Sequence, residues 1–175
     1  MSERDLSTLG NDNRADQARP ANGQWGLPRG IRNHNPGNLK ELAGDNTRWQ
    51  GERATDDDPV FEEFDSPTMG IRALALTLIN YTLLHDLHTV AEVIARWAPP
   101  SENDSGAYLA SVCRRCEYEP GQWVDLDMEF APLLLLTEAI IHHENGKPPA
   151  DWPQATWYPL ATLVKGVERA TLQHA

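Results

Sequence analysis

The sequence predicts a mostly α-helical protein built as one compact domain. Apolar residues recur at three- and four-residue spacing in several segments, capping residues stand before these segments, and no segment shows a strong strand pattern. The length of 175 residues, with 40% apolar and 23% charged residues, is typical of a single folded, soluble domain. We expect a flexible polar leader over residues 1–24 and the domain over residues 25–175.

The first helix is predicted to begin at Ser66-Pro67, because serine is a good N-cap and proline is favoured at the first helical position. An apolar stripe follows at helical spacing, made of Ile71, Leu74, Leu78 and Tyr81. A second helix is predicted to begin at Thr89, which forms a capping-box pattern with Glu92, and to end before Pro99. Both helices should bury one face.

Three further helices are predicted in the second half of the chain. They span about 104–116, about 127 or 132 to 145, and 159–172. Gly146 suits the position just past the end of the fourth helix.

The region before the first helix is predicted to be irregular. Residues 25–38 are rich in Gly, Pro and Asn and predict an ordered loop. Residues 40–58 stay polar, and the acidic run 56–58 is typical of a solvated loop. Residues 60–64 are predicted to form a short extended piece.

Charge and hydropathy exclude several classes of function. With 26 acidic and 15 basic residues the net charge is −11, which argues against binding to nucleic acid. No apolar run approaches the roughly 18–20 residues of a membrane helix, so no membrane-spanning segment is expected. The N-terminus has no apolar segment of a secretory signal, so we expect synthesis in the cytoplasm and another route to any site of action outside it.

The two cysteines, Cys113 and Cys116, stand in a C-x-x-C pair. Such a pair supplies half of a zinc site, and His142 and His143 could supply the rest. No second C-x-x-C and no H-x3-H is present, so two ordinary thiols are the simpler interpretation.

The strongest candidate for chemistry is Glu144, in the last turn of the fourth predicted helix. It continues the apolar stripe of Leu133, Leu136 or Thr137, and Ile140. Apolar surroundings and the negative end of the helix dipole should both raise its pKa. A carboxylic acid that is partly protonated near neutral pH can protonate the leaving oxygen in glycoside cleavage. The alternative is a solvated residue at a frayed helix end.

Other residues are weaker candidates. Glu138 lies about 120° around the helix from Glu144, so we expect it outside the same site. His142 and His143 point in different directions, so at most one can face the cleft of Glu144. Glu102, in the loop that leads into the third predicted helix, is the second candidate acid.

Two groups of loop residues could bind sugars. Asn35 and Asn38 belong to an Asn-rich loop, and amide side chains suit both loop architecture and sugar hydroxyl or acetamido groups. Loop tryptophans can stack on sugar faces, although most tryptophans simply pack; this set comprises Trp25, Trp49, Trp97, Trp152 and Trp157.

Several short motifs, in order, resemble a family of phage-encoded and prophage-encoded peptidoglycan-degrading structural proteins and endolysins. The opening string RGIRNHNPGN at 29–38 resembles the family's RGIRNNNPGN. The resemblance continues with RWAPPSEND at 96–104 and HENG at 143–146, and covers about residues 29–148.

The resemblance implies a lysozyme-like domain that acts as a muramidase or a lytic transglycosylase. In lysozyme-like transglycosylases the catalytic Glu at a helix end comes before an Asn-Pro stretch. Here Asn35-Pro36 comes first and Glu144-Asn145-Gly146 comes last. This order implies a circular permutation, with the catalytic helix near the C-terminus. Without permutation, Glu102 or Glu41 becomes the better acid.

The implied reaction is cleavage of the β-1,4 bond between N-acetylmuramic acid and N-acetylglucosamine. Glu144 is the expected acid and base, acting on water or on the muramic 6-hydroxyl. Ser66, Asn103 and Tyr108 are expected to position sugar groups or developing charge. The resemblance implies no metal and no organic cofactor.

The expected partner is peptidoglycan, reached in the periplasm or on a target wall through a phage virion or a secretion system, and the chain is expected to be a monomer. Because the net charge is −11, electrostatic attraction to an anionic wall should contribute little. Two alternatives stay open: a non-catalytic phage or secretion module that binds glycan or protein, and a zinc-stabilised interaction domain that uses Cys113 and Cys116.

Overall fold

The computed structural model describes residues 26–41, 48–55, 57–101 and 104–172, and these residues form six helices. The helices in chain order are α1 (Arg29–Arg32), α2 (Pro67–His85), α3 (Val90–Trp97), α4 (Ser105–Cys116), α5 (Phe130–Asn145) and α6 (Leu160–Thr171). The mostly α prediction is confirmed, as are the five predicted helices within a few residues at each end. The predicted leader over residues 1–24 lies outside the described residues.

Local sequence signals set the helix ends. Thr89 and Glu92 form the predicted capping box at the start of α3, with the Thr89 hydroxyl accepting from the Glu92 N–H. Asp104 caps α4 by accepting from the N–H of Ala107 at 3.0 Å. Gly146 follows α5 with a φ of 69°, a conformation that costs glycine little.

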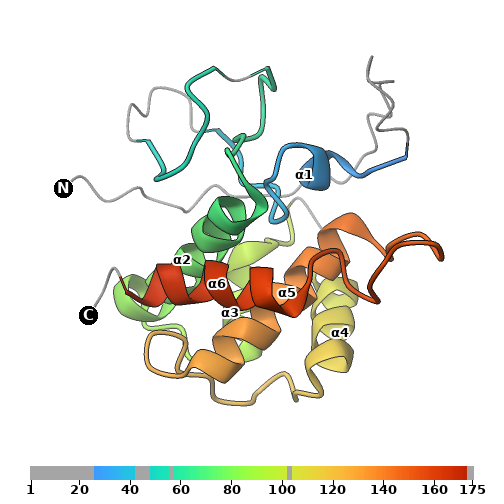
Figure 1. Cartoon of the computed structure of the whole chain (residues 1–175). Helices are drawn as coiled ribbons and strands as arrows, with labels where there is room; N and C mark the ends of the chain where they lie inside the picture. Colours follow the sequence, from blue (N-terminus) through green and yellow to red (C-terminus); the bar gives the residue numbers. More distant parts are fainter. Residues whose placement is uncertain (1–25, 42–47, 56, 102–103, 173–175) are drawn as a thin grey trace.

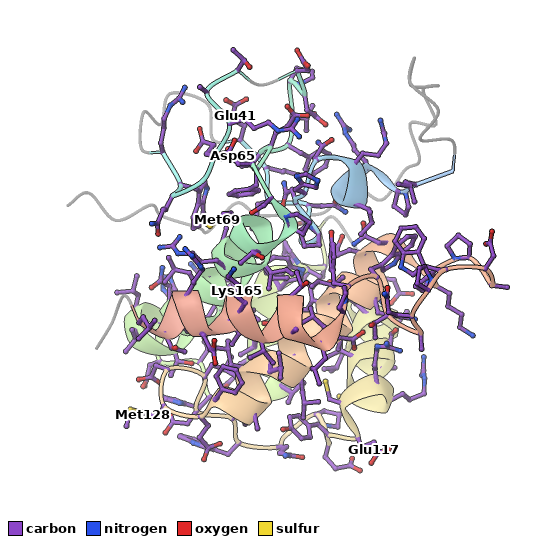
Figure 2. The ribbon with its side chains drawn as sticks, in the orientation of Figure 1. Glu41, Asp65, Met69, Glu117, Met128 and Lys165 are labelled. Atoms are coloured by element: carbon purple, nitrogen blue, oxygen red, sulfur yellow. The ribbon has the colours of Figure 1, made fainter. Side chains whose placement is uncertain are left out.

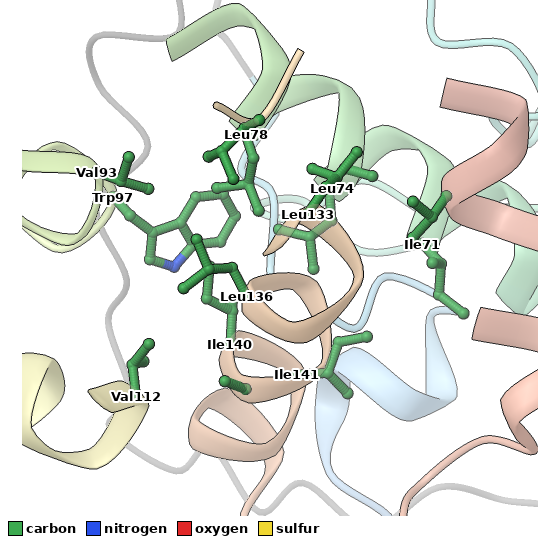
Figure 3. Close-up of a cluster of buried hydrophobic side chains, with 14 of the residues drawn as sticks. Ile71, Leu74, Leu78, Val93, Trp97, Val112, Leu133, Leu136, Ile140 and Ile141 are labelled. Atoms are coloured by element: carbon green, nitrogen blue, oxygen red, sulfur yellow. The ribbon is translucent and has the colours of Figure 1, made fainter. Parts of the chain in front are cut away.

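Helix α2 is buried along most of its length and packs against α6 and α5 (Figure 1). The predicted stripe is completely buried at Ile71, Leu74, Leu78 and Tyr81. Helix α6 packs along α2, and Gly166 allows the close approach, because a Cβ there would lie 2.5 Å from Cγ2 of Ile71. Figure 3 shows side chains of α2, α3, α4 and α5 that meet in this core.

Two expectations for the region before α2 are corrected. The part of the predicted loop at Arg29–Arg32 forms one helical turn, α1, whose N-cap is Pro28. The acidic run is not simply solvated, because the Asp58 carboxylate bonds to Arg29 and Asn33 at 2.6 Å. The positive charge of Arg29 and four donors explain why Asp58 folds inward.

The predicted extended piece at 60–64 takes part in two isolated bridges. Phe61 pairs with Lys40, and Phe64 pairs with Glu52. Both phenylalanines are buried, so the piece ties the polar segment 48–55 to the body of the domain.

Within the described ranges, none of the helices combines the length and the apolar character needed to cross a membrane. Cys113 and Cys116 are buried free thiols, and the described residues contain no group of three or more His, Cys, Asp or Glu side chains placed to hold a metal ion.

Candidate active site

Glu144 lies in the last turn of α5 and is only 5% exposed. The stripe that precedes it on the same helix is buried as predicted, at Leu133, Leu136, Thr137 and Ile140. The sequence alternative of a solvated residue at a frayed end is therefore wrong. A buried carboxylate needs hydrogen-bond partners, because burial without them is costly.

Within the described part of the chain, side chains from three separate segments donate hydrogen bonds to this carboxylate. The hydroxyl of Tyr108 in α4 lies 2.6 Å from Oε1, and the indole N–H of Trp97 in α3 lies 3.3 Å from the same oxygen. Nδ2 of Asn38, in the loop after α1, lies 3.0 Å from Oε2. The carboxylate is thus held at both oxygens by neutral donors.

The cluster also affects the ionisation of Tyr108. Burial, followed by the charge and hydrogen bond of Glu144, raises the pKa of Tyr108 well above its usual value. Tyr108 therefore stays a phenol and can donate to Glu144.

The loop that carries Asn38 is fixed by its own polar side chains. Asn35 is completely buried and bonds the backbone of Leu39 and Glu62. Asn145, next to Glu144, donates to the carbonyl of Pro36 at 2.8 Å. This bond ties the loop to the end of α5 directly.

A glycine makes room where α1 and this loop meet α5. A Cβ on Gly30 would lie 2.6 Å from Oδ1 of Asn38, 2.7 Å from Oδ1 of Asn145 and 2.7 Å from the carbonyl oxygen of Asn35. The RGIR turn therefore needs glycine at this position for the Asn38–Glu144 contact to form.

His143 covers Tyr108. Its ring lies 3.7 Å from the Tyr108 ring, centroid to centroid, with a tilt of 33°. Burial, and then the neighbouring His142, lower the pKa of His143. Of the two histidines, His143 is thus the one that packs beside the Glu144 cluster.

His142 faces a different feature of the surface. It lines a hollow of about 370 Å³ together with Arg115 and Lys147. Burial and then Arg115 lower the pKa of His142.

The other residues predicted from sequence fall in different places. Ser66 is the N-cap residue of α2 and makes no side-chain capping bond, and Glu41 is exposed. Glu102 and Asn103 lie outside the described residues. Glu138 forms a two-pronged ion pair with Arg115 at 2.6 Å, apart from Glu144 as expected.

Reasoning from sequence did not identify Trp97 as a partner of Glu144. It grouped Trp97 with loop tryptophans that could stack on sugars, but the residue ends α3 and is 2% exposed. Figure 3 shows its indole among the core side chains of α2 and α5. The buried apolar residues at Val93, Ile94 and Val90 give α3 one inward face, and Trp97 continues it at helical spacing.

The chain is 40% identical over 121 residues to Protein P5 of Pseudoalteromonas phage PM2, an alignment that covers 69% of this chain and 73% of that protein. The chain belongs to the family of this phage protein. No family model matches the P5-family chain.

Proposed function

We propose that this P5-family protein cleaves the glycan strands of peptidoglycan at the bond between N-acetylmuramic acid and N-acetylglucosamine. The observation that carries the proposal is one buried carboxylate, Glu144, held by three neutral donors from separate segments. A fixed carboxylate at the end of a buried helix is the arrangement that a single-residue acid and base requires. The motif resemblance over residues 29–148 supplies the substrate class.

In the proposed mechanism, protonated Glu144 transfers its proton to the glycosidic oxygen as the bond to the sugar carbon breaks. The resulting carboxylate is stabilised by Tyr108, Trp97 and Asn38. It then removes a proton from water or from the muramic 6-hydroxyl, whose oxygen bonds to the anomeric carbon. Glu144 regains its proton, and the cycle is closed.

The proposed domain is lysozyme-like with a circularly permuted order. The Asn-rich loop comes at the start of the domain and the helix of Glu144 near its end. Their contact through Asn38 and Asn145 supports this interpretation, because it joins the two motifs in space. The phage relative supports delivery with a phage particle.

The test compares the wild type with Glu144→Gln, which keeps the size of the side chain but removes the transferable proton. The control is Glu138→Gln, which changes a carboxylate on the same helix outside the cluster. Purified sacculi are digested and the soluble products are analysed by mass spectrometry, which separates reducing sugars from anhydro sugars. We expect products from the wild type and the control and none from Glu144→Gln. Equal product release by a folded Glu144→Gln variant would overturn the assignment.

A non-catalytic module that binds glycan or protein is the second candidate. The observation in its favour is that all three donors stabilise the ionised carboxylate, which suits a structural polar cluster as well as a base. This candidate expects no soluble products from any variant and unchanged binding to sacculi by Glu144→Gln.

A further inference from the structure

Trp123 is a large aromatic residue at the surface, 65% exposed. It lies in the segment between α4 and α5, whereas Trp97 and Trp157 are buried and Trp49 and Trp152 are partly buried. Exposure of an indole leaves apolar area in contact with water, which costs free energy unless a ligand covers it.

The backbone holds Trp123 in a defined place. It pairs with Thr89 in an isolated bridge, and the flanking residues bond across to the start of α3. The N–H of Val124 donates to the carbonyl of His88 at 2.7 Å, and the N–H of Val90 donates to the carbonyl of Gln122 at 3.2 Å. The backbone at Trp123 is therefore held by its pairing with the residues around Thr89.

One face of the indole is already covered. The ring of His88 lies parallel to it, with centroids 4.4 Å apart and an angle of 2° between the planes. His88 is itself fixed, because Nε2 lies 3.1 Å from Asp86 and Nδ1 lies 3.7 Å from Asp125. A stack of this kind presents the opposite indole face to solvent as a flat, rigid platform.

Two carboxylates lie on the covered side of the platform, against the ring of His88. The side chain of Asp86 is 98% exposed and that of Asp125 is 37% exposed. The open side of the platform is the indole face opposite His88, and a sugar ring offers an apolar C–H face that stacks on such a surface. This stacking fits a neutral sugar and needs no positive charge on the protein, in keeping with a net charge of −11.

The platform is separate from the Glu144 cluster. Helices α4 and α5 pack against each other, with Tyr108 and Glu144 at one end of the pair and the segment of Trp123 joining the other ends. The 16 residues of α5 correspond to a length on the order of 24 Å. Figure 2 shows Glu117 and Met128, which flank this segment, at the lower edge of the molecule.

We propose that the open face of Trp123, backed by His88, forms a second glycan-binding site that takes a neutral N-acetylated sugar of a polymeric strand. The identity of the glycan rests on the proposed function, whereas the site itself rests on the stacked and exposed indole. A surface site of this kind raises the affinity for a long strand by adding a second point of attachment.

Binding is measured by co-sedimentation with purified sacculi, using the full chain with Glu144→Gln so that the polymer is not consumed. The test variant adds Trp123→Ala, and the control adds Met128→Ala, which removes another exposed apolar side chain, 77% exposed, from the same segment. We expect Trp123→Ala to weaken binding at least about fivefold and the control to leave it unchanged. Equal binding by both variants would overturn the proposal.

A second measurement identifies the ligand. The indole N–H signal of Trp123, assigned by its loss in Trp123→Phe, is followed by NMR during titration with an N-acetylglucosamine hexamer. We expect the signal to shift, and Asp86→Asn to change the affinity less than about threefold, because Asp86 contacts His88 on the covered side of the indole. A cation site would instead respond to tetramethylammonium and lose its binding in Asp86→Asn, which would overturn the proposal.

The two proposals fail in different ways. If sacculi are bound through Trp123 but no variant releases products, the catalytic assignment of Glu144 fails and the glycan site stands. If the wild type releases products and Trp123→Ala binds like the control, the glycan site fails and the catalytic assignment stands.

Discussion

The hydroxyl of Tyr108 lies 2.6 Å from Oε1 of Glu144, although the two residues are 36 positions apart in the chain. The contact joins the first turn of α4 to the last turn of α5, which pack against each other. Because Tyr108 is 2% exposed and Glu144 is 5% exposed, the hydrogen bond forms with little competition from water. It links the Glu144 carboxylate directly to helix α4.

We predict that Tyr108→Phe folds but loses about 10- to 100-fold of any glycan-cleaving activity. The phenylalanine ring keeps the packing against His143, whereas the donor to the Glu144 carboxylate is lost. The free energy of unfolding should fall by only about 1–2 kcal/mol, because one buried hydrogen bond is removed. Product release from sacculi and denaturant unfolding check the two effects. Unchanged activity would contradict a role for this hydrogen bond in the reaction.

We predict that Gly30→Ala displaces Asn38 and lowers both stability and activity. The added Cβ would lie 2.6–2.7 Å from the side-chain oxygens of Asn38 and Asn145. The expected destabilisation is about 1–3 kcal/mol, as for other overpacked sites. Gly106→Ala is the matched control, because its Cβ would meet only Oδ1 of Asp104 at an ordinary 3.5 Å. Thermal unfolding of the two variants should differ clearly, and equal midpoints would contradict the packing argument.

The hydrogen bonds that the Asp58 carboxylate accepts from Arg29 and Asn33 should depend on pH. Burial alone would raise its pKa, but hydrogen bonds from Arg29, Asn33 and the backbone outweigh this, and the net pKa is lowered. A lowered pKa in the folded state stabilises the fold above the unfolded pKa, and this stability is lost as the pH falls through the folded pKa.

We therefore predict that Asp58→Asn lowers the free energy of unfolding by about 2 kcal/mol near neutral pH. The difference from the wild type should begin to shrink as the pH falls below about 4, the unfolded pKa, and should vanish only below the lowered pKa of folded Asp58, where the wild type is itself protonated. Urea unfolding at several pH values measures both. Asp151→Asn, at an exposed position, is the control. A difference that stays constant down to the lowest pH would contradict the role of the charge.

The thiols of Cys113 and Cys116 are predicted to be unreactive in the folded protein. Both are buried, and burial, followed by the charge of Glu138, raises the pKa of Cys116 to about 12. Burial also raises the pKa of Cys113. At about pH 8 a thiol reagent should modify neither residue until the chain is unfolded in denaturant. Rapid modification of two thiols per folded chain would contradict this.

Local sequence patterns predicted most of the helices and placed Glu144 at the end of a buried helix face. The capping box at Thr89, the Ser66-Pro67 start and the glycine at 146 act over a few residues, so they can be found without knowledge of the fold. The stripe that ends at Glu144 likewise follows from helix geometry alone. Local patterns did not predict the short helix α1 or the hydrogen bonds of Asp58. Asp58 bonds to Arg29 and Asn33, which lie 25 or more residues away in sequence.

The sequence by itself determined that the chain is mostly helical, that it carries a net charge of −11 and that Glu144 ends a buried face of α5. Only the tertiary structure decided which groups surround that carboxylate, because Asn38, Trp97 and Tyr108 are 106, 47 and 36 positions away from it. Helix periodicity states which face is buried but not what it meets. The meeting of these donors depends on how α3, α4 and the Asn-rich loop pack around α5, and that packing is set by the whole core.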